Sequence, residues 1–364
     1  MNILWLSWRD IKNPQRGGAE IFDIENATRL HKNGFKVTIF TSYFRNAKAN
    51  EKIKGVKIIR KGNLITCRFY AFIYYLKHNN FDIIIDEINT IPFFSIFYAK
   101  KKTLPIIHQL AKEFWFSHTI WPINIIGHFL EPIWLSFYKN MPTIVVSSST
   151  KKDLTKLNFN KIKILKIGLN FKPHFSTNKD NLIVFIGRIV KAKGVEDAIF
   201  AFKAIHDKLP MYKLKITGRG NKHYTQKLKS LSKTLGLETS VQFTDYISEN
   251  KKIALLQKSK ITLIPSIREG WGIVATESNA LCSVPIAYNI PGLKDAILNG
   301  QTGLLVKRNP NKLAEATIAL LKNDLLWNTL AKNGYENSKK YNWNNCYLDF
   351  NKIIVDLYKS MITT

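Results

Sequence analysis

The chain has 364 residues, of which 45% are apolar and 22% charged; this excludes a disordered protein and predicts two domains of ordinary size. The formal net charge is +29, but the excess is spread over both halves and its longest run is the three lysines at 100–102, unlike a nucleic-acid-binding arm. An anionic lipid surface, a phosphorylated substrate and a lysine-rich proteome are all compatible with this charge. Three cysteines without metal-type spacing, and an apolar start too short for a secretory signal, lead us to expect a cytoplasmic protein.

The first half alternates strands and helices. A strand at 2–8, a helix at 19–34 that stops at a glycine, and a strand at 36–42 open the chain. The following strand-like runs are short and rich in Val and Ile, as in a parallel sheet that is covered on both faces. They lie at 56–60, 82–86, 104–108, 143–149 and 161–168.

The same alternation begins again after a polar stretch at 168–181, where we place the hinge. Residues 1–170 are predicted to form an N-terminal domain and 171–341 a C-terminal domain, while 342–364 forms a helix that packs back on the first. The fold class is α/β, with two doubly wound Rossmann-like domains facing each other across a cleft. Strands are expected in the second domain at 182–187, 212–218, 240–245, 260–266, 284–288 and 302–306, and helices at 194–209 and 311–323.

The segment 114–138 breaks this rhythm. Its first 17 residues, before Glu131, contain no Lys, Arg, Asp or Glu. Two prolines, two histidines and an asparagine interrupt the segment, and the run is too short for a membrane-spanning helix. Two interpretations stay open. The segment is either a core helix with a packed loop, or an interfacial segment that meets lipid or a lipid-linked acceptor.

The stretch EGWGIVATE contains two glutamates, Glu269 and Glu277, directly after a predicted buried strand. If a helix begins near Gly272, the free N–H groups of Gly272, Ile273 and Val274 attract an anion such as a diphosphate. Carboxylates repel phosphate, so the two glutamates are better suited to accept hydrogen bonds from sugar hydroxyls. One acid for each of two sugar rings is the expected division.

Arg188 and Lys193 lie in the loop after the strand at 182–187, in GRIVKAKG. Both cations could reach the same cleft and balance a diphosphate. The residues alone leave one alternative open: Arg188 and Lys193 are two ordinary surface charges of a basic chain.

Taken together, the motif R-x4-K-G, the motif E-G-x-G-x4-E and the run PIAYNIPGLKDAILNGQTGLLV resemble glycosyltransferase family 4, the retaining GT-B glycosyltransferases of the glycosyl transferases group 1. NPQRGGAE, VVSSSTKKDL and ILKIGLNFKPHF resemble segments of the first domain and the hinge, so the likeness extends over nearly the whole chain. The resemblance implies that the N-terminal domain, 1–170, binds the acceptor and that the C-terminal domain, 171–341, binds the nucleotide sugar. It implies that Glu277 holds the ribose and Glu269 the transferred sugar. It also implies that Arg188 and Lys193 stabilise the leaving diphosphate. The implied donor-binding residues are Gly17, Gly18, Arg188, Lys193, Tyr246, Glu269, Gly270, Trp271, Gly272, Ile273, Val274 and Glu277.

His108 ends a predicted strand in PIIHQLAKEFW, where the family has a histidine that touches the donor sugar; the implied catalytic set is therefore His108, Arg188, Lys193 and Glu269. Asp86 and Glu87 are weaker candidates for acceptor binding, and a capping or surface acid pair is an equal alternative. The chain contains no D-x-D motif, so we expect transfer without a metal ion and without a cofactor.

The resemblance therefore implies an enzyme that moves a sugar from a nucleotide sugar to a glycan or lipid-linked acceptor with retention of configuration. It is expected to be cytoplasmic, with peripheral contact to an anionic membrane. A nucleotide-sugar epimerase or hydrolase on the same fold is the first alternative. A non-enzymatic, basic nucleic-acid-binding protein is a more remote one, because the chain has no clustered basic stripe.

Overall fold

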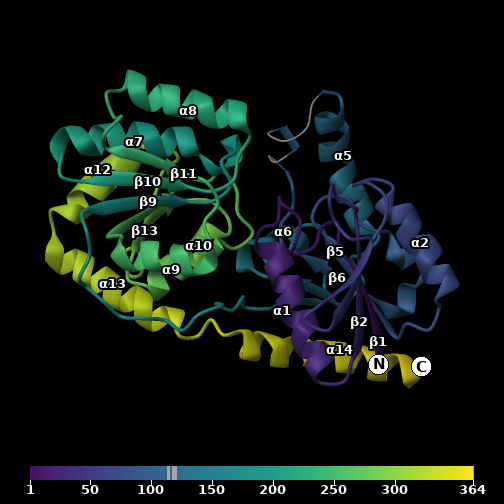
Figure 1. Cartoon of the computed structure of the whole chain (residues 1–364). Coiled ribbons are helices and arrows are strands. Elements are labelled where there is room, and N and C mark those ends of the chain that lie inside the picture. The colour runs from purple at the N-terminus through teal and green to yellow at the C-terminus, as the bar shows by residue number, and fades with distance from the viewer. Residues whose placement is uncertain (113–114, 117–120, 364) are drawn as a thin grey trace. The chain divides into compact units, whose positions relative to one another are not determined.

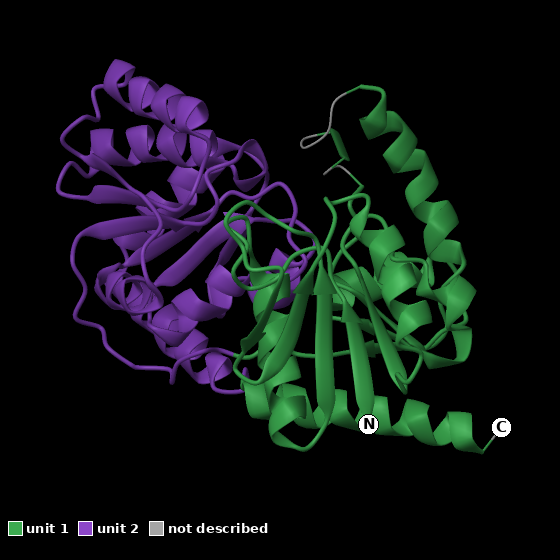
Figure 2. Cartoon of the chain, turned by 45° about the vertical axis from the view of Figure 1, so that its right-hand side comes forward, with its two compact units in different colours: residues 1–168, 342–364 green, residues 169–341 purple. Residues whose placement is uncertain are grey.

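The computed structural model describes residues 1–112, 115–116 and 121–363. The chain divides into two compact units, 1–168 together with 342–364 (unit 1) and 169–341 (unit 2), coloured separately in Figure 2. The boundary expected from the sequence, between residues 170 and 171, lies two residues from this division.

Unit 1 is built on an eight-stranded sheet in the order β3-β4-β2-β1-β5-β6-β7-β8. All neighbouring pairs are parallel except β3 with β4. The central strands are almost entirely buried because helices cover both faces, which explains why they lack polar alternation. The strands are β1 (Asn2–Leu6), β2 (Lys36–Thr41), β3 (Asn50–Ile53), β4 (Val56–Arg60), β5 (Ile83–Ile88), β6 (Thr103–Ile107), β7 (Thr143–Val145) and β8 (Ile162–Ile164).

The C-terminal helix belongs to unit 1. Helix α14 (Trp343–Ile362) runs beside α1 (Gly18–Lys32), as Figure 1 shows, and the ring of Phe350 packs 5.5 Å from that of Trp5 and 6.1 Å from that of Phe22. These aromatic contacts lie in the core of the unit and fix the end of the chain there. The other helices of the unit are α2 (Cys67–Lys77), α3 (Ser95–Tyr98), α5 (Ile123–Ser136) and α6 (Ser148–Thr155), with the short 3-10 helix η1 (Lys100–Lys102).

Unit 2 is a second doubly wound sheet, parallel throughout, in the order β11-β10-β9-β12-β13-β14. Its strands are β9 (Leu182–Ile186), β10 (Lys213–Thr217), β11 (Val241–Thr244), β12 (Ile261–Ile264), β13 (Val284–Tyr288) and β14 (Leu304–Val306). Its helices are η2 (Lys191–Lys193), α7 (Val195–Lys208), α8 (Lys222–Thr234), α9 (Glu249–Lys258), α10 (Ile273–Ala280), α11 (Leu293–Ala296), α12 (Pro310–Leu321) and α13 (Asp324–Ser338).

The predicted strands all occur, but two end earlier than expected. The run 143–149 leaves the sheet after Val145, because the side chain of Ser147 accepts the N–H of Thr150 and caps α6. The run 161–168 contributes only β8, and the antiparallel edge strand β3 has no apolar pattern that predicts it. None of the helices formed by the described residues is long and apolar enough to cross a membrane.

Candidate active site

In unit 2 the predicted donor-binding residues gather where the strand order reverses. From β9 the chain moves outward through β10 and β11, and it then returns to the other side of β9 to form β12. Arg188 and Lys193 follow the carboxyl end of β9, and Glu269 follows that of β12. Ligands of open α/β sheets bind at such a switch point.

Backbone contacts join these two loops. The N–H of Ile267 donates to the carbonyl of Ala192 at 3.0 Å. Gly194 has a left-handed backbone (φ 70°), and a Cβ there would lie 2.0 Å from the carbonyl oxygen of Pro265. Only glycine permits this close approach. Lys193, one residue earlier, forms an ion pair with Glu269 across the junction.

The two glutamates each keep one carboxylate oxygen available. In Glu269, Oε1 accepts from Lys193 and, at 2.8 Å, from the hydroxyl of Ser266; in Glu277, Oε1 accepts from Lys252 at 2.6 Å. Within the described part of the chain, Oε2 of neither residue accepts a hydrogen bond, and neither oxygen is a fully buried unsatisfied atom. Each carboxylate is thus held in place by a lysine while presenting an unused acceptor, as recognition of a hydroxyl requires.

Lys252, on α9, is a site residue that the sequence analysis missed. Its amino group contacts both Glu277 and Glu249, and this raises its pKa against the opposing effect of burial. Burial raises the pKa of Glu277, and the charge of Lys252 opposes that rise. In the sequence, Lys252 and Glu249 look like an ordinary surface ion pair within one helix. Nothing there indicates that Lys252 also contacts Glu277 of α10.

Helix α10 begins at Ile273, one residue after the predicted start. Gly272 is its N-cap with φ 87°, and a Cβ there would lie 2.6 Å from Leu293. Gly292 has φ 83°, and its Cβ would lie 2.2 Å from the carbonyl oxygen of Glu269. The two glycines therefore let the 291–293 turn support the loop before α10, whose first N–H groups have no partner within the helix.

Trp271 and Tyr246, two other predicted donor-binding residues, have different surroundings. The indole of Trp271 is buried, donates to the hydroxyl of Thr276 at 2.9 Å and packs edge-on against Tyr341 at 5.4 Å, which gives it a packing role beside Gly270. Tyr246 follows β11, is 46% exposed and lies under the guanidinium of Arg219 at 4.5 Å. This exposed pair at the carboxyl ends of β10 and β11 offers a flat cationic platform.

In unit 1, a second group of predicted residues lies at a second switch point, between β1 and β5. Gly17 is the N-cap of α1 after the β1 loop, and Gly18 is the first residue of that helix. The N–H of Gly17 donates to the carboxylate of Glu20 at 2.6 Å, which occupies a donor that a phosphate would otherwise use. Glu87 lies in β5, and His108 directly follows β6.

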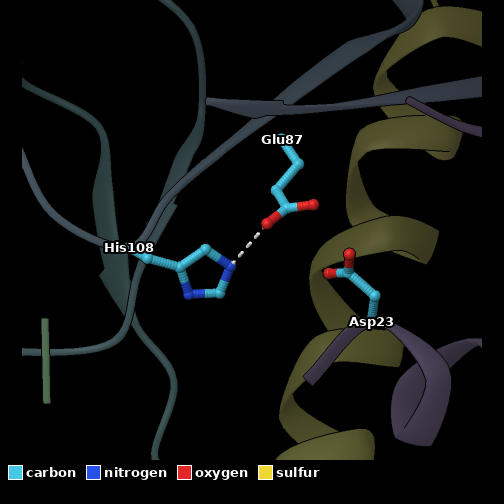
Figure 3. Close-up of side chains that lie close together, drawn as sticks. All are labelled: Asp23, Glu87 and His108. Carbon is cyan, nitrogen blue, oxygen red and sulfur yellow. Dashed lines mark ion pairs between the residues drawn. The ribbon is translucent and has the colours of Figure 1, made fainter. Parts of the chain in front are cut away.

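His108 is turned toward buried carboxyl groups. Its Nε2 lies 3.3 Å from Oε1 of Glu87, and its ring packs edge-on against Phe22 at 5.3 Å. Figure 3 shows the carboxyl of Asp23, from α1, pointing to the same place; one ligand atom of each of Asp23, Glu87 and His108 lies within 4.8 Å of the others. While Nε2 faces Glu87, a hydrogen bond from this ring to a sugar has to come from Nδ1.

The charges in this cluster are divided unequally. Burial raises the pKa of Glu87, but contacts with His108 and Asp23 outweigh burial and lower it to about 2. Burial and the charge of Glu87 raise the pKa of Asp23 well above its ordinary value. The arrangement is therefore a neutral Asp23 beside an ionised Glu87 that pairs with His108. Among the described residues these three side chains are also the group that could hold a metal ion, so transfer without metal stays a prediction.

Asp86 differs from Glu87 because adjacent strand residues point to opposite faces of the sheet. Its carboxylate is fully buried and accepts four hydrogen bonds: from the N–H groups of Phe93 and Ser95, the hydroxyl of Ser95, and Tyr138 at 2.7 Å. This satisfied carboxylate orders the 91–95 turn, which favours a structural role over acceptor binding for Asp86.

Comparison with known proteins is consistent with this geometry. Residues 167–339 match the sequence profile of the family described as "Glycosyl transferases group 1". Residues 167–339 form a glycosyl transferases group 1 domain. The match covers both glutamates, Arg188 and Lys193. It confirms the family resemblance that these motifs carry.

Relatives extend the likeness beyond the group 1 domain. An uncharacterized glycosyltransferase of Methanocaldococcus jannaschii is 31% identical over 216 residues, 59% of each chain. A capsular polysaccharide biosynthesis glycosyltransferase, CapM, of Staphylococcus aureus is 29% identical over 191 residues, 49% of this chain and 46% of CapM. The alignments thus span about half of each relative's length.

A solved structure covers more of the fold. Anabaena HepE, crystallised with UDP and glucose, superposes with a TM-score of 0.75 over 98% of this chain and 100% of that one, at 15% identity. The likeness in fold over both units confirms the predicted GT-B class.

Proposed function

We propose that this protein is a glycosyltransferase that moves a sugar from a nucleotide diphosphate to a glycan or lipid-linked acceptor. The observation that carries the proposal is the switch point of unit 2. There, two lysine-held carboxylates, each with an unused oxygen, flank the start of α10 beside Arg188. A nucleotide sugar offers hydroxyl groups for the two acids and a diphosphate for the cations.

In the proposed reaction, Glu277 binds the ribose hydroxyls and Glu269 the hydroxyls of the transferred sugar. Arg188 and Lys193 bind the diphosphate together with the N–H groups that begin α10, and they stabilise the charge that grows on it as the glycosidic bond breaks. Arg188 suits this role because, within the described residues, none of its side-chain atoms is committed to an ion pair. Lys193 has to share its charge between Glu269 and the ligand.

We further propose that the donor carries uridine, that transfer retains the anomeric configuration, and that it needs no metal ion. HepE was crystallised with UDP, and CapM bears the name of a polysaccharide biosynthesis enzyme; both support the choice of donor and of a glycan acceptor. The cations of the site supply the charge that a metal ion would otherwise bring. The enzyme is proposed to work in the cytoplasm, at an anionic membrane.

Transfer from a panel of UDP-sugars to lipid-linked and free glycan acceptors tests the proposal, with release of UDP and the product anomer as readouts. We expect UDP release that depends on an acceptor, proceeds in EDTA and gives the donor's anomeric configuration. Consumption of donor at the same rate without acceptor would instead support a hydrolase or epimerase. A requirement for a divalent cation would contradict the proposed role of Arg188 and Lys193.

A further inference from the structure

Helix α5 of unit 1 is apolar on nearly every side, although much of it faces solvent. Its inner side contains Gly127, Glu131, Trp134 and Leu135, at the spacing of one helical face. The outer side exposes a set of large apolar side chains: Ile123, Ile125, Ile126, Phe129, Leu130, Ile133 and Phe137. Phe129 is 69% exposed. A helix that is apolar all round is normally buried, so this outer side indicates a surface that is covered in use.

The exposed apolar surface continues beyond α5. The ring of Phe97, 66% exposed, packs edge-on against Phe137 at 5.1 Å, and its neighbour Tyr98 contacts Phe72 and Tyr75 of α2. Next along α2, Phe69 is also exposed. Figure 1 shows α2 and α5 in the same part of unit 1. We call the outer side of α5 together with Phe97 and Phe69 the apolar surface.

The exposed charges on the chain segments that form the apolar surface have one sign. From residue 61 to 140, five lysines are exposed: Lys61, Lys77, Lys100, Lys101 and Lys139. The acidic residues described in this range are Asp82, which accepts the N–H of Asn2 and is half-buried, and three buried ones, Asp86, Glu87 and Glu131. In the described part of this range no acid is exposed. Lys139 lies two residues from Phe137, Lys100 lies three residues from Phe97, and the amino group of Lys61 lies 4.6 Å from the ring centroid of Tyr70, the neighbour of Phe69. These lysines form a basic rim of the apolar surface that complements a negatively charged partner.

We propose that the apolar surface docks unit 1 on an anionic lipid bilayer, with α5 lying in the interface. Helices that lie in a bilayer interface combine apolar side chains at the depth of the headgroups with cations at the rim, and this surface has both. A second copy of the chain would instead bring the exposed lysines of two rims together, which costs Coulomb energy.

The docking surface is connected to the His108 cluster. The carboxylate of Glu131 accepts the N–H of Lys112 at 2.9 Å, that of Ala111, and the indole N–H of Trp115 at 3.3 Å. Ala111 is three residues from His108, a span of about 10 Å at most. A bilayer under α5 thus lies near the loop that leaves the sheet at His108. This connection rests on the proposed function, and it favours the lipid-linked class of acceptor over a free glycan.

Cosedimentation with lipid vesicles tests docking without any need for activity. The whole chain is mixed with phosphatidylcholine vesicles that contain 0 or 30% phosphatidylglycerol, chosen as about the anionic content of a charged leaflet. The double variant Phe129→Ser/Ile133→Ser removes two exposed side chains of α5. The matched control, Leu325→Ser/Leu348→Ser, removes two apolar side chains elsewhere that are at least as exposed, 81% and 62%.

We expect the wild type and the control to bind the anionic vesicles and the α5 variant to bind at least about 30-fold more weakly, from the loss of two buried apolar side chains. Lys100→Gln/Lys101→Gln should weaken binding about 30-fold at low salt, and Lys227→Gln/Lys229→Gln on α8 should not. Equal binding by the α5 variant and the control would overturn the proposal. So would a chain that dimerises through α5 in sedimentation velocity and ignores vesicles.

The unfolding temperature with UDP, measured on the same variants, separates this proposal from the proposed function. If the α5 variant loses vesicle binding while UDP still raises its unfolding temperature as in the wild type, the substitutions affect docking through α5 and leave the nucleotide site intact. If the wild-type chain binds vesicles but binds no nucleotide, the docking proposal holds and the proposed glycosyltransferase function fails.

Discussion

Replacement of Asp23 by asparagine gives the sharpest test of the buried cluster in unit 1. Asp23 is fully buried, and no described residue donates a hydrogen bond to either of its carboxyl oxygens. Burial and the charge of Glu87 raise its pKa, so the folded chain keeps Asp23 protonated to a higher pH than the unfolded chain, in which the carboxyl ionises near its ordinary value of 3.8. Asparagine has the same shape as the protonated acid and never ionises.

The sign of the effect follows from proton linkage. The folded state binds a proton that the unfolded state releases. Asp23 therefore destabilises the folded chain, and this destabilisation grows as the pH rises above 3.8. The cost grows by up to about 1.4 kcal/mol per pH unit. We therefore expect Asp23→Asn to match the wild type near pH 4 and to become progressively more stable than it as the pH rises.

Urea unfolding from pH 4.5 to 8 measures this difference. The control is Asp207→Asn, an exposed residue paired with Lys203 on α7, where the change should stay below about 1 kcal/mol at every pH. A variant Asp23→Asn that loses stability most at pH 7 would refute the reasoning. It would show that Asp23 is ionised and pairs with a cation, for which a metal ion on Asp23, Glu87 and His108 is the candidate.

Three further predictions concern unit 2. Glu269→Gln keeps the shape but removes the charge, so kcat/KM for transfer should fall about 100-fold or more with little change in folding, whereas Glu315→Gln on the surface of α12 should be neutral. Lys193→Ala should weaken binding of UDP at least about tenfold, while Lys191→Ala, an exposed residue in the same loop, should not. Gly292→Ala forces a Cβ to 2.2 Å from the carbonyl oxygen of Glu269, so we expect about 1–3 kcal/mol lower stability of unit 2 together with weaker donor binding, both read from unfolding with and without UDP.

The sequence predicted the parts of the fold that have a local signal. Short apolar runs, many of them rich in Val and Ile, identified every parallel strand, because a strand buried on both faces needs no polar alternation. The edge strand β3, NEKI, has no such composition and forms by pairing with β4. The early end of β7 depends on the cap at Ser147, which is visible in the sequence only once the strand's length is known.

The candidate site divides in the same way. Glu269, Glu277, Arg188 and Lys193 belong to motifs with fixed spacing, so they could be chosen from the sequence. Asp23, Lys252 and Arg219 could not. Each reaches its partner from a different element, and an acid or a lysine inside an amphipathic helix looks the same whether it faces water or a buried carboxylate.

The segment 114–138 shows the limit of pattern reading most clearly. Residues 114 and 117–120 lie outside the described part. For the remaining residues, the sequence left core packing and lipid contact as alternatives. Helix α5 has a buried side, with Trp134 and Leu135, and an exposed side, with Phe129 and Ile133. No periodic polar face distinguishes the two sides, because both are apolar; only the packing around Glu131 shows which side is which.

The central claim, a nucleotide-sugar site at the switch point of unit 2, is tested most directly by thermal unfolding of the whole chain with UDP, GDP and their sugars in EDTA. A nucleotide at 100 times its dissociation constant should add about 2.7 kcal/mol, or about 5–10 °C for a unit of this size. We predict such a shift with UDP compounds and its loss in Glu277→Gln. No shift with any nucleotide, or a shift of the same size in Glu277→Gln, would contradict the claim.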